Sequence, residues 1–104
     1  MAIVKVRFLP VALMGKMYSG DPVKVVVDAF DAGNYTESEL FVVNGDSEDA
    51  AEEAFDLTNN PYRQDEREEK YGRGRSISVG DVVVVGEEEW VCLPMGWKEL
   101  KVAA

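Results

Sequence analysis

The sequence predicts an α+β domain, with a mostly antiparallel sheet of about five to six strands and one amphipathic helix at about residues 47–59 packed on it. Two observations predict this fold. Several short segments alternate apolar with charged residues or are rich in valine, as strands are. One segment separates acidic from apolar residues at the period of a helix. The 104 residues suit one hydrophobic core, so we expect a single domain over residues 1–104.

Three strands are expected in the first half of the chain. Residues 2–8 alternate basic with apolar side chains, which is typical of a half-buried strand. Residues 23–30 are rich in β-branched side chains and predict a second strand, and residues 39–43 predict a third. Residues 14–22 contain two glycines and a proline and predict a loop. The opening of the chain is therefore interpreted as a meander.

The segment 47–59 gives the strongest helical signal. Asp46 or Ser47 can cap the first free amides of the helix through its side chain. At 100° per residue the acidic and apolar residues fall on separate faces, with Phe55 and Leu57 as the main core anchors. The acidic face is formed by Glu48, Asp49, Glu52, Glu53 and Asp56.

Shorter elements follow this helix. A possible second helix, short and exposed, is expected at about residues 61–71, because Pro61 suits the first helical position. Residues 81–85 and 89–93 predict a hairpin, since turn residues separate two apolar runs. Residues 97–102 predict a last strand.

The charge distribution points to the kind of partner. The chain has 20 acidic and 11 basic residues, a net charge of −9. Residues 28–69 carry fourteen acids against two arginines, or −12. Such a field repels phosphates and favours association with cations. We therefore expect a protein partner with a basic surface, and neither direct nucleic-acid binding nor membrane binding.

The sequence offers no catalytic constellation. Histidine is absent, and Cys92, the only cysteine, lies among apolar residues that predict a buried, unreactive thiol. No phosphate loop, nucleophile elbow or zinc pattern occurs. The apolar runs, such as Val82–Val85, are far too short to span a membrane. We expect a cytoplasmic protein that is not an enzyme and uses no cofactor or metal.

One loop admits a different interpretation. In the stretch 72–86, glycines alternate with Arg73 and Arg75 ahead of a run of valines. The two arginines can serve as counter-charges to the acidic helix, or they can bind an anionic ligand. Ser78 and Asp81 have the spacing of a capping box, which predicts one helical turn before the valines.

The density of charge on the acidic face allows two interpretations. Five carboxylates span eight residue steps, so one charge falls every ~2.4 Å along a helix that rises ~1.5 Å per residue. Duplex DNA carries one per ~1.7 Å. A DNA mimic is therefore physically allowed. The alternative is a solvated helix face that only keeps the protein soluble.

The second half of the chain, about residues 50–100, resembles the YodL-like domain. The resemblance rests on Ala51-Glu-Glu-Ala-Phe55, Asn59-Asn60, Gly74-Arg-Ser-Ile-Ser-Val-Gly-Asp-Val-Val83, Trp90-Val-Cys92 and Gly96-Trp97. The chain departs from the family pattern at Leu93, where the family has Asp, and at Trp97, where it has Phe. The resemblance implies a small protein or accessory domain of bacteria, phages or mobile elements, with a protein-binding role and no catalytic residues.

The sequence is therefore compatible with three candidate functions. The first is a non-enzymatic interaction module, phage or mobile-element encoded, that binds and modulates or inhibits a host or defence protein in the host cytoplasm. The second is a DNA mimic of the anti-restriction or anti-CRISPR type. The third is a ligand-binding or enzymatic domain that uses the Arg73 and Arg75 loop.

Overall fold

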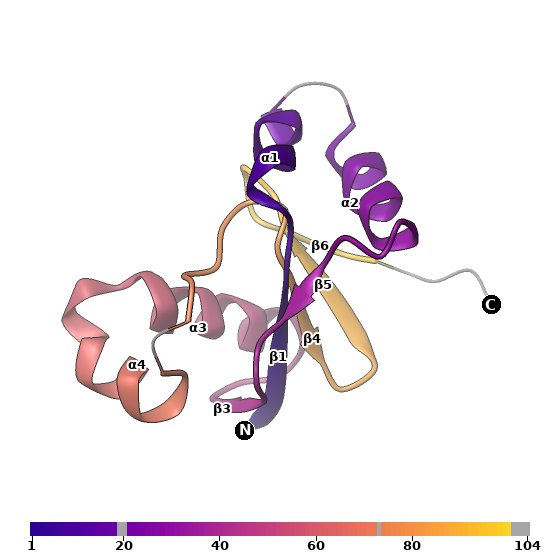
Figure 1. The fold of residues 1–104 in the computed structure, drawn as a ribbon. Helices are drawn as coiled ribbons and strands as arrows, with labels where there is room; N and C mark the ends of the chain where they lie inside the picture. Colours follow the sequence, from indigo (N-terminus) through magenta and orange to yellow (C-terminus); the bar gives the residue numbers. More distant parts are fainter. Residues whose placement is uncertain (19–20, 73, 101–104) are drawn as a thin grey trace.

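The computed structural model describes residues 1–18, 21–72 and 74–100, and shows an α+β fold (Figure 1). Within these residues one six-stranded sheet is accompanied by four α-helices. The elements in chain order are β1 (Ala2–Phe8), α1 (Val11–Met14), the 3-10 helix η1 (Gly15–Tyr18), α2 (Pro22–Asp31), β2 (Thr36–Glu37), β3 (Phe41–Val43), α3 (Ser47–Asn59), the 3-10 helix η2 (Pro61–Arg63), α4 (Gln64–Lys70), β4 (Val82–Val85), β5 (Glu88–Cys92) and β6 (Trp97–Glu99).

The strand order is β2-β1-β4-β5-β6, and β3 also pairs with β1; these pairs are antiparallel. Successive side chains of a strand point to opposite faces, so each face of the sheet builds its own core. One core places Val4, Val6 and Val83 against α3. The other places Val82 and Val91 against the layer formed by α1, η1 and α2. Figure 1 shows α3 and α4 together, well separated from α1 and α2.

Several predicted elements are confirmed. The strand at residues 2–8 is β1, the helix at 47–59 is α3, and the hairpin is β4–β5. The second helix expected at 61–71 is present as η2 followed by α4. In α3 the residues that lie closest to the sheet are small. Ala50, Ala51 and Ala54 are fully buried, which lets the helix backbone approach the valines of the sheet.

The strand predicted at residues 23–30 is wrong, because this segment is the helix α2. The valines suit a strand, but the residues before them start a helix. Asp21 caps it by accepting hydrogen bonds from the backbone N–H groups of Val23 and Lys24, and Pro22 occupies the first turn. Val26 and Ala29 are the buried residues of the helix, at the three-residue spacing of a helix face. Tertiary burial of this face overrides the β propensity of the valines.

Three further expectations for the first half need correction. Residues 11–18, where a loop was expected from residue 14, form α1 and η1, while residues 19 and 20 lie outside the described residues. The opening is not a meander, since helices separate β1 from β2. The strand expected at 39–43 is shorter, at Phe41–Val43, and the two-residue β2 precedes it.

The expectations for residues 78–81 and 97–102 are also revised. Residues 78–81 form a β-turn and not a helical turn, because Asp81 N–H donates to the Ser78 carbonyl at 3.0 Å and Gly80 has a φ of 92°. A positive φ at the third position is the signature of a type II turn. The last strand is observed as β6 at Trp97–Glu99, and residues 101–102 of the prediction lie outside the described residues.

We predict that Gly80→Ala lowers the free energy of unfolding by about 2–4 kcal/mol, because alanine is strained at this φ and its Cβ would overlap the Leu9 side chain. Gly15→Ala is the matched control. Gly15 has a helical φ of −61° and open space around it, so its replacement should leave stability unchanged or raise it by up to about 1 kcal/mol. Urea unfolding followed by circular dichroism measures both; equal effects would contradict the assigned turn.

Candidate functional site

The first half of α3 presents the exposed part of the predicted acidic face. Glu48, Asp49 and Glu52 are exposed to solvent. Within the described residues none of the three forms an ion pair with a lysine or arginine. Glu48 and Asp49 also lie in the first turn, where the helix dipole favours negative charge. The charge of this part of the helix is therefore not neutralised by any lysine or arginine of the described residues.

The second half of the predicted acidic face is paired within the chain. Arg63 donates two hydrogen bonds to the carboxylate of Glu53, from Nη1 to Oε1 at 2.7 Å and from Nη2 to Oε2 at 3.0 Å. The same guanidinium reaches Asp56 Oδ2 and Glu66 Oε1, each at 2.8 Å. Arg63, together with Lys70, lowers the pKa of Glu66 to about 2. Arg63 thus joins η2 and α4 to α3 and neutralises charge that the sequence interpretation assigned to a partner.

The β4–β5 hairpin adds two acidic residues, Glu87 in its turn and Glu88 at the start of β5, to which no sequence pattern pointed. Ser47 Oγ does not cap α3; it donates instead to Glu88 Oε2 at 3.1 Å, and Asp46, the N-cap residue, makes no side-chain cap bond. This contact brings Glu87 and Glu88 to the start of α3. No local sequence signal links residues 47 and 88. We define the acidic surface as Glu48, Asp49, Glu52, Glu87 and Glu88.

Two tryptophans brace the acidic surface. Trp90 Nε1 donates to Glu88 Oε1 at 3.0 Å, and Trp97 Nε1 donates to Glu52 Oε2 at 2.6 Å. The Trp97 ring also meets Phe55 edge-on, with 6.2 Å between ring centroids. Indole donors hold two of the carboxylates without neutralising them. Two carboxylates of the acidic surface, those of Glu88 and Glu52, are therefore held in place by tryptophans of β5 and β6.

The loop candidates form an internal network around Asp81. Its carboxylate is fully buried and accepts from the backbone N–H of Leu9 at 2.8 Å and of Ser78 at 2.7 Å. Arg75 Nη2 donates to the same carboxylate at 2.9 Å and to the Leu9 carbonyl at 3.1 Å, and its guanidinium lies over the Phe8 ring. Burial raises the pKa of Asp81, and these three donors oppose that shift.

Arg75 is therefore a counter-charge to Asp81, whereas the sequence suggested that it either balances the acidic helix or binds an anionic ligand. Arg73 lies outside the described residues. The loop is also tied to the end of α3: Ser76 Oγ donates to the Thr58 carbonyl at 2.7 Å, and Ile77 N–H donates to Thr58 Oγ1 at 3.1 Å. Asn59 Nδ2 donates to the Ile77 carbonyl at 3.0 Å. These contacts give Arg75, Ser78 and Asp81 structural partners.

Cys92, the only cysteine of the chain, is buried. Burial raises the pKa of the Cys92 thiol to about 12, so the reactive thiolate is scarce at neutral pH. In the part of the chain that the structure describes, no three acidic or cysteine side chains gather in a way that could hold a metal ion.

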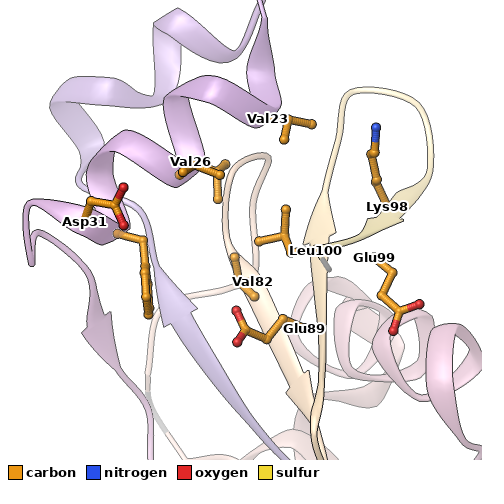
Figure 2. A pocket seen from close by; sticks show the side chains of 10 residues that line it. Val23, Val26, Asp31, Val82, Glu89, Lys98, Glu99 and Leu100 are labelled. Atoms are coloured by element: carbon orange, nitrogen blue, oxygen red, sulfur yellow. The ribbon is translucent and has the colours of Figure 1, made fainter. Parts of the chain in front are cut away.

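A cavity of about 790 Å³ lies between α2 and the sheet (Figure 2). This volume is in the range of small-molecule sites. Its apolar lining comes from Val23, Val26, Val27, Phe30, Val82 and Leu100, and its charged lining from Asp31, Glu89, Lys98 and Glu99. Figure 2 shows Val23 on α2 and Lys98 on the edge strand in the upper part of the view, with Leu100 and Val82 below them. No sequence signal predicted this cavity, because its helical wall was interpreted as a strand.

Arg7 supports one wall of this cavity. Its guanidinium carbon lies 4.9 Å from the centre of the Phe30 ring, and its Nη1 lies 3.1 Å from Glu89 Oε2. Arg7 also pairs with Glu37 at 3.4 Å. The charge of Glu89 is thus balanced inside the chain.

Comparisons with protein-family models, with curated proteins and with solved structures gave no match. Among the helices in the described ranges, none is both long and apolar enough to cross a membrane.

We predict that Arg75→Ala lowers the free energy of unfolding by about 1–3 kcal/mol at neutral pH, because the buried carboxylate of Asp81 loses a charged donor. The pKa of Asp81, already raised in the folded state, rises further without Arg75. The folded variant then binds the proton more tightly than the unfolded chain, whose Asp pKa is about 3.9. The difference in unfolding free energy between the wild type and Arg75→Ala should therefore shrink as the pH falls through the raised pKa of Asp81 in the folded state.

Urea unfolding of both proteins across a pH series measures this difference. The control is the same substitution in an Asp81→Asn background, where no carboxylate titrates and the effect of removing Arg75 should not vary with pH. A pH-independent loss in both backgrounds would contradict the assigned ion pair.

Proposed function

We propose that this chain is a small acidic, non-enzymatic interaction module that binds a basic surface of a protein partner through its acidic surface. One observation carries the proposal: the carboxylates of this surface have no cationic partner within the described residues, whereas many of the basic side chains do have anionic ones. The paired basic residues are Lys5, Arg7, Lys24, Arg63, Lys70 and Arg75.

The electrostatics favour fast association with a cationic protein. Net charge of −9 gives the whole molecule a negative field, and the acidic surface concentrates it on one side of α3 and the β4–β5 turn. Complementary charges steer diffusional encounter and select against partners of the wrong sign. Because exposed charges are screened over about 8 Å at physiological salt, the association rate should fall as salt rises.

The resemblance to the YodL-like domain adds the setting of the proposal. Proteins of that family are small accessory proteins of bacteria, phages and mobile elements. We therefore infer that the partner is a host or defence protein in the cytoplasm and that binding modulates or inhibits it.

A DNA mimic remains the second candidate function. The spacing of Glu48, Asp49 and Glu52 along the helix supports it, because their charge density is comparable to that of the phosphates of duplex DNA, although lower. Arg63 pairs with Glu53 and Asp56, so only three of the five carboxylates on this helix face remain without a cationic partner within the described residues. We therefore rank mimicry below binding to a basic protein surface.

We predict that the variant carrying Glu48→Lys, Asp49→Lys and Glu52→Lys loses binding by tenfold or more, because attraction becomes repulsion at the contact. The wild-type chain, immobilised, would capture the partner from a bacterial host lysate, and the purified partner would then be titrated against each variant. A second variant, carrying Asp65→Lys, Glu68→Lys and Glu69→Lys on α4, is the matched control. Both variants change the net charge from −9 to −3, since three reversals add +6.

Equal losses in the two variants would show that only net charge matters and would overturn the acidic surface. Unchanged binding of the first variant would do the same. Adding duplex DNA separates the two candidate functions. If DNA competes with the chain for one site on the partner, mimicry is favoured; if both bind together, it is excluded.

A further inference from the structure

The strand β6 leaves one edge of the sheet open within the described residues. β6 is the last strand of the sheet order and pairs with β5 on one side. Leu100 N–H donates to the Glu89 carbonyl at 2.8 Å, and Leu93 N–H donates to the Gly96 carbonyl at 2.9 Å. Backbone groups of an antiparallel strand alternate in direction. The N–H and C=O groups of Trp97 and Glu99 therefore point away from β5, to the outside.

The cavity under α2 opens beside this edge. Lys98 and Leu100 line the cavity from the edge strand, and Val23 and Val27 line it from the helix. Val27 and Phe30 are 42% and 48% exposed, which is high for large apolar side chains of a helix packed on a sheet. An edge strand next to a helix, with apolar side chains between them, forms a groove whose shape suits an extended chain.

The two faces of β6 differ in chemistry. Lys98 and Leu100 face α2, while Trp97 and Glu99 face α3, as the bond from Trp97 to Glu52 shows. Glu99 also borders the cavity, but Figure 2 shows its carboxylate directed away from Leu100, on the side of α3. A strand added to β6 would place alternate side chains under α2 and beside the carboxylates of Glu52 and Glu99.

The charges around β6 favour basic side chains of a bound segment on the α3 side and not in the groove. Glu89 is paired with Arg7, and Asp31 and Lys98 carry opposite charges at the rim. The groove itself therefore has little net charge and prefers apolar side chains. On the opposite face, Glu52 and Glu99 form no ion pair within the described residues, so they favour lysine or arginine.

We propose that an extended segment of the partner, alternating apolar with basic residues, adds to β6 as a further strand. Its backbone pairs with Trp97 and Glu99, its apolar side chains enter the groove beneath α2, and its basic side chains meet Glu99 and Glu52. The expectation of basic residues in the segment rests on the proposed function. The expectations of apolar residues and of backbone pairing rest on the cavity beneath α2 and on the unpaired edge of β6.

A labelled peptide of alternating lysine and valine, about eight residues long as strands are, tests the proposal. A peptide of the same composition, with its lysines and valines in two blocks, is the control. Fluorescence anisotropy should show that the alternating peptide binds the intact chain at least tenfold more tightly. Equal affinities would overturn the proposal, because charge alone would then explain binding.

Two readouts locate the peptide. Hydrogen exchange followed by NMR should show that the alternating peptide protects the amides of Trp97 and Glu99, which have no hydrogen-bond partner in the part of the chain that the structure describes. Val27→Glu should weaken binding about tenfold, while Val11→Glu, an equally polar change at an exposed position on α1 outside the groove, should leave it unchanged. Circular dichroism verifies that both variants fold. Absence of protection at these two amides would exclude strand addition.

Partner capture by the two kinds of variant distinguishes failure of the groove from failure of the acidic surface. If reversal of Glu48, Asp49 and Glu52 abolishes capture of the partner but Val27→Glu does not affect it, the groove is excluded and the acidic surface stands. If Val27→Glu abolishes capture and the charge reversal does not affect it, the groove stands and the acidic surface is excluded as the main contact.

Discussion

The buried carboxylate of Asp81 is the interaction on which the arrangement of the two cores depends. It accepts from the backbone of Leu9, where β1 leaves the sheet, and from Ser78 in the turn before β4. Arg75 completes its shell of donors. Such a charge is costly to bury unless its oxygens are all bonded. The geometry of this site therefore determines where the chain turns from the sheet toward α1 and α2.

The two candidate surfaces follow from that junction and from the end of α3. Tyr35 Oη donates to the Gly80 carbonyl at 2.8 Å, so the chain that leaves α2 is tied to the same turn as Asp81. Thr58 and Asn59 bind the loop on the other side of the sheet. The α2 layer thus forms a wall of the groove, and α3 carries the acidic surface. β6 lies between them and presents one face to each.

Much of the architecture could be predicted because its signals are local. The alternation in β1, the two-faced pattern of α3 and the apolar runs of β4 and β5 each depend on neighbours in sequence. The helix α2 was missed because propensity and capping disagreed there. Asp21 and Pro22 signalled a helix start, whereas the valines suggested a strand, and only burial of Val26 and Ala29 decided between them.

The sequence by itself determined the acidic excess, the absence of histidine and the face of α3 on which five carboxylates lie. Tertiary structure alone decided which of those charges remain available, because Arg63 reaches Glu53 across ten residues and Ser47 reaches Glu88 across forty-one. It also decided that Arg75 pairs with Asp81 and that an apolar groove opens beside a strand edge that is unpaired within residues 1–18, 21–72 and 74–100. Ion pairs, edges and cavities depend on contacts between distant segments, and no periodicity in the sequence encodes such contacts.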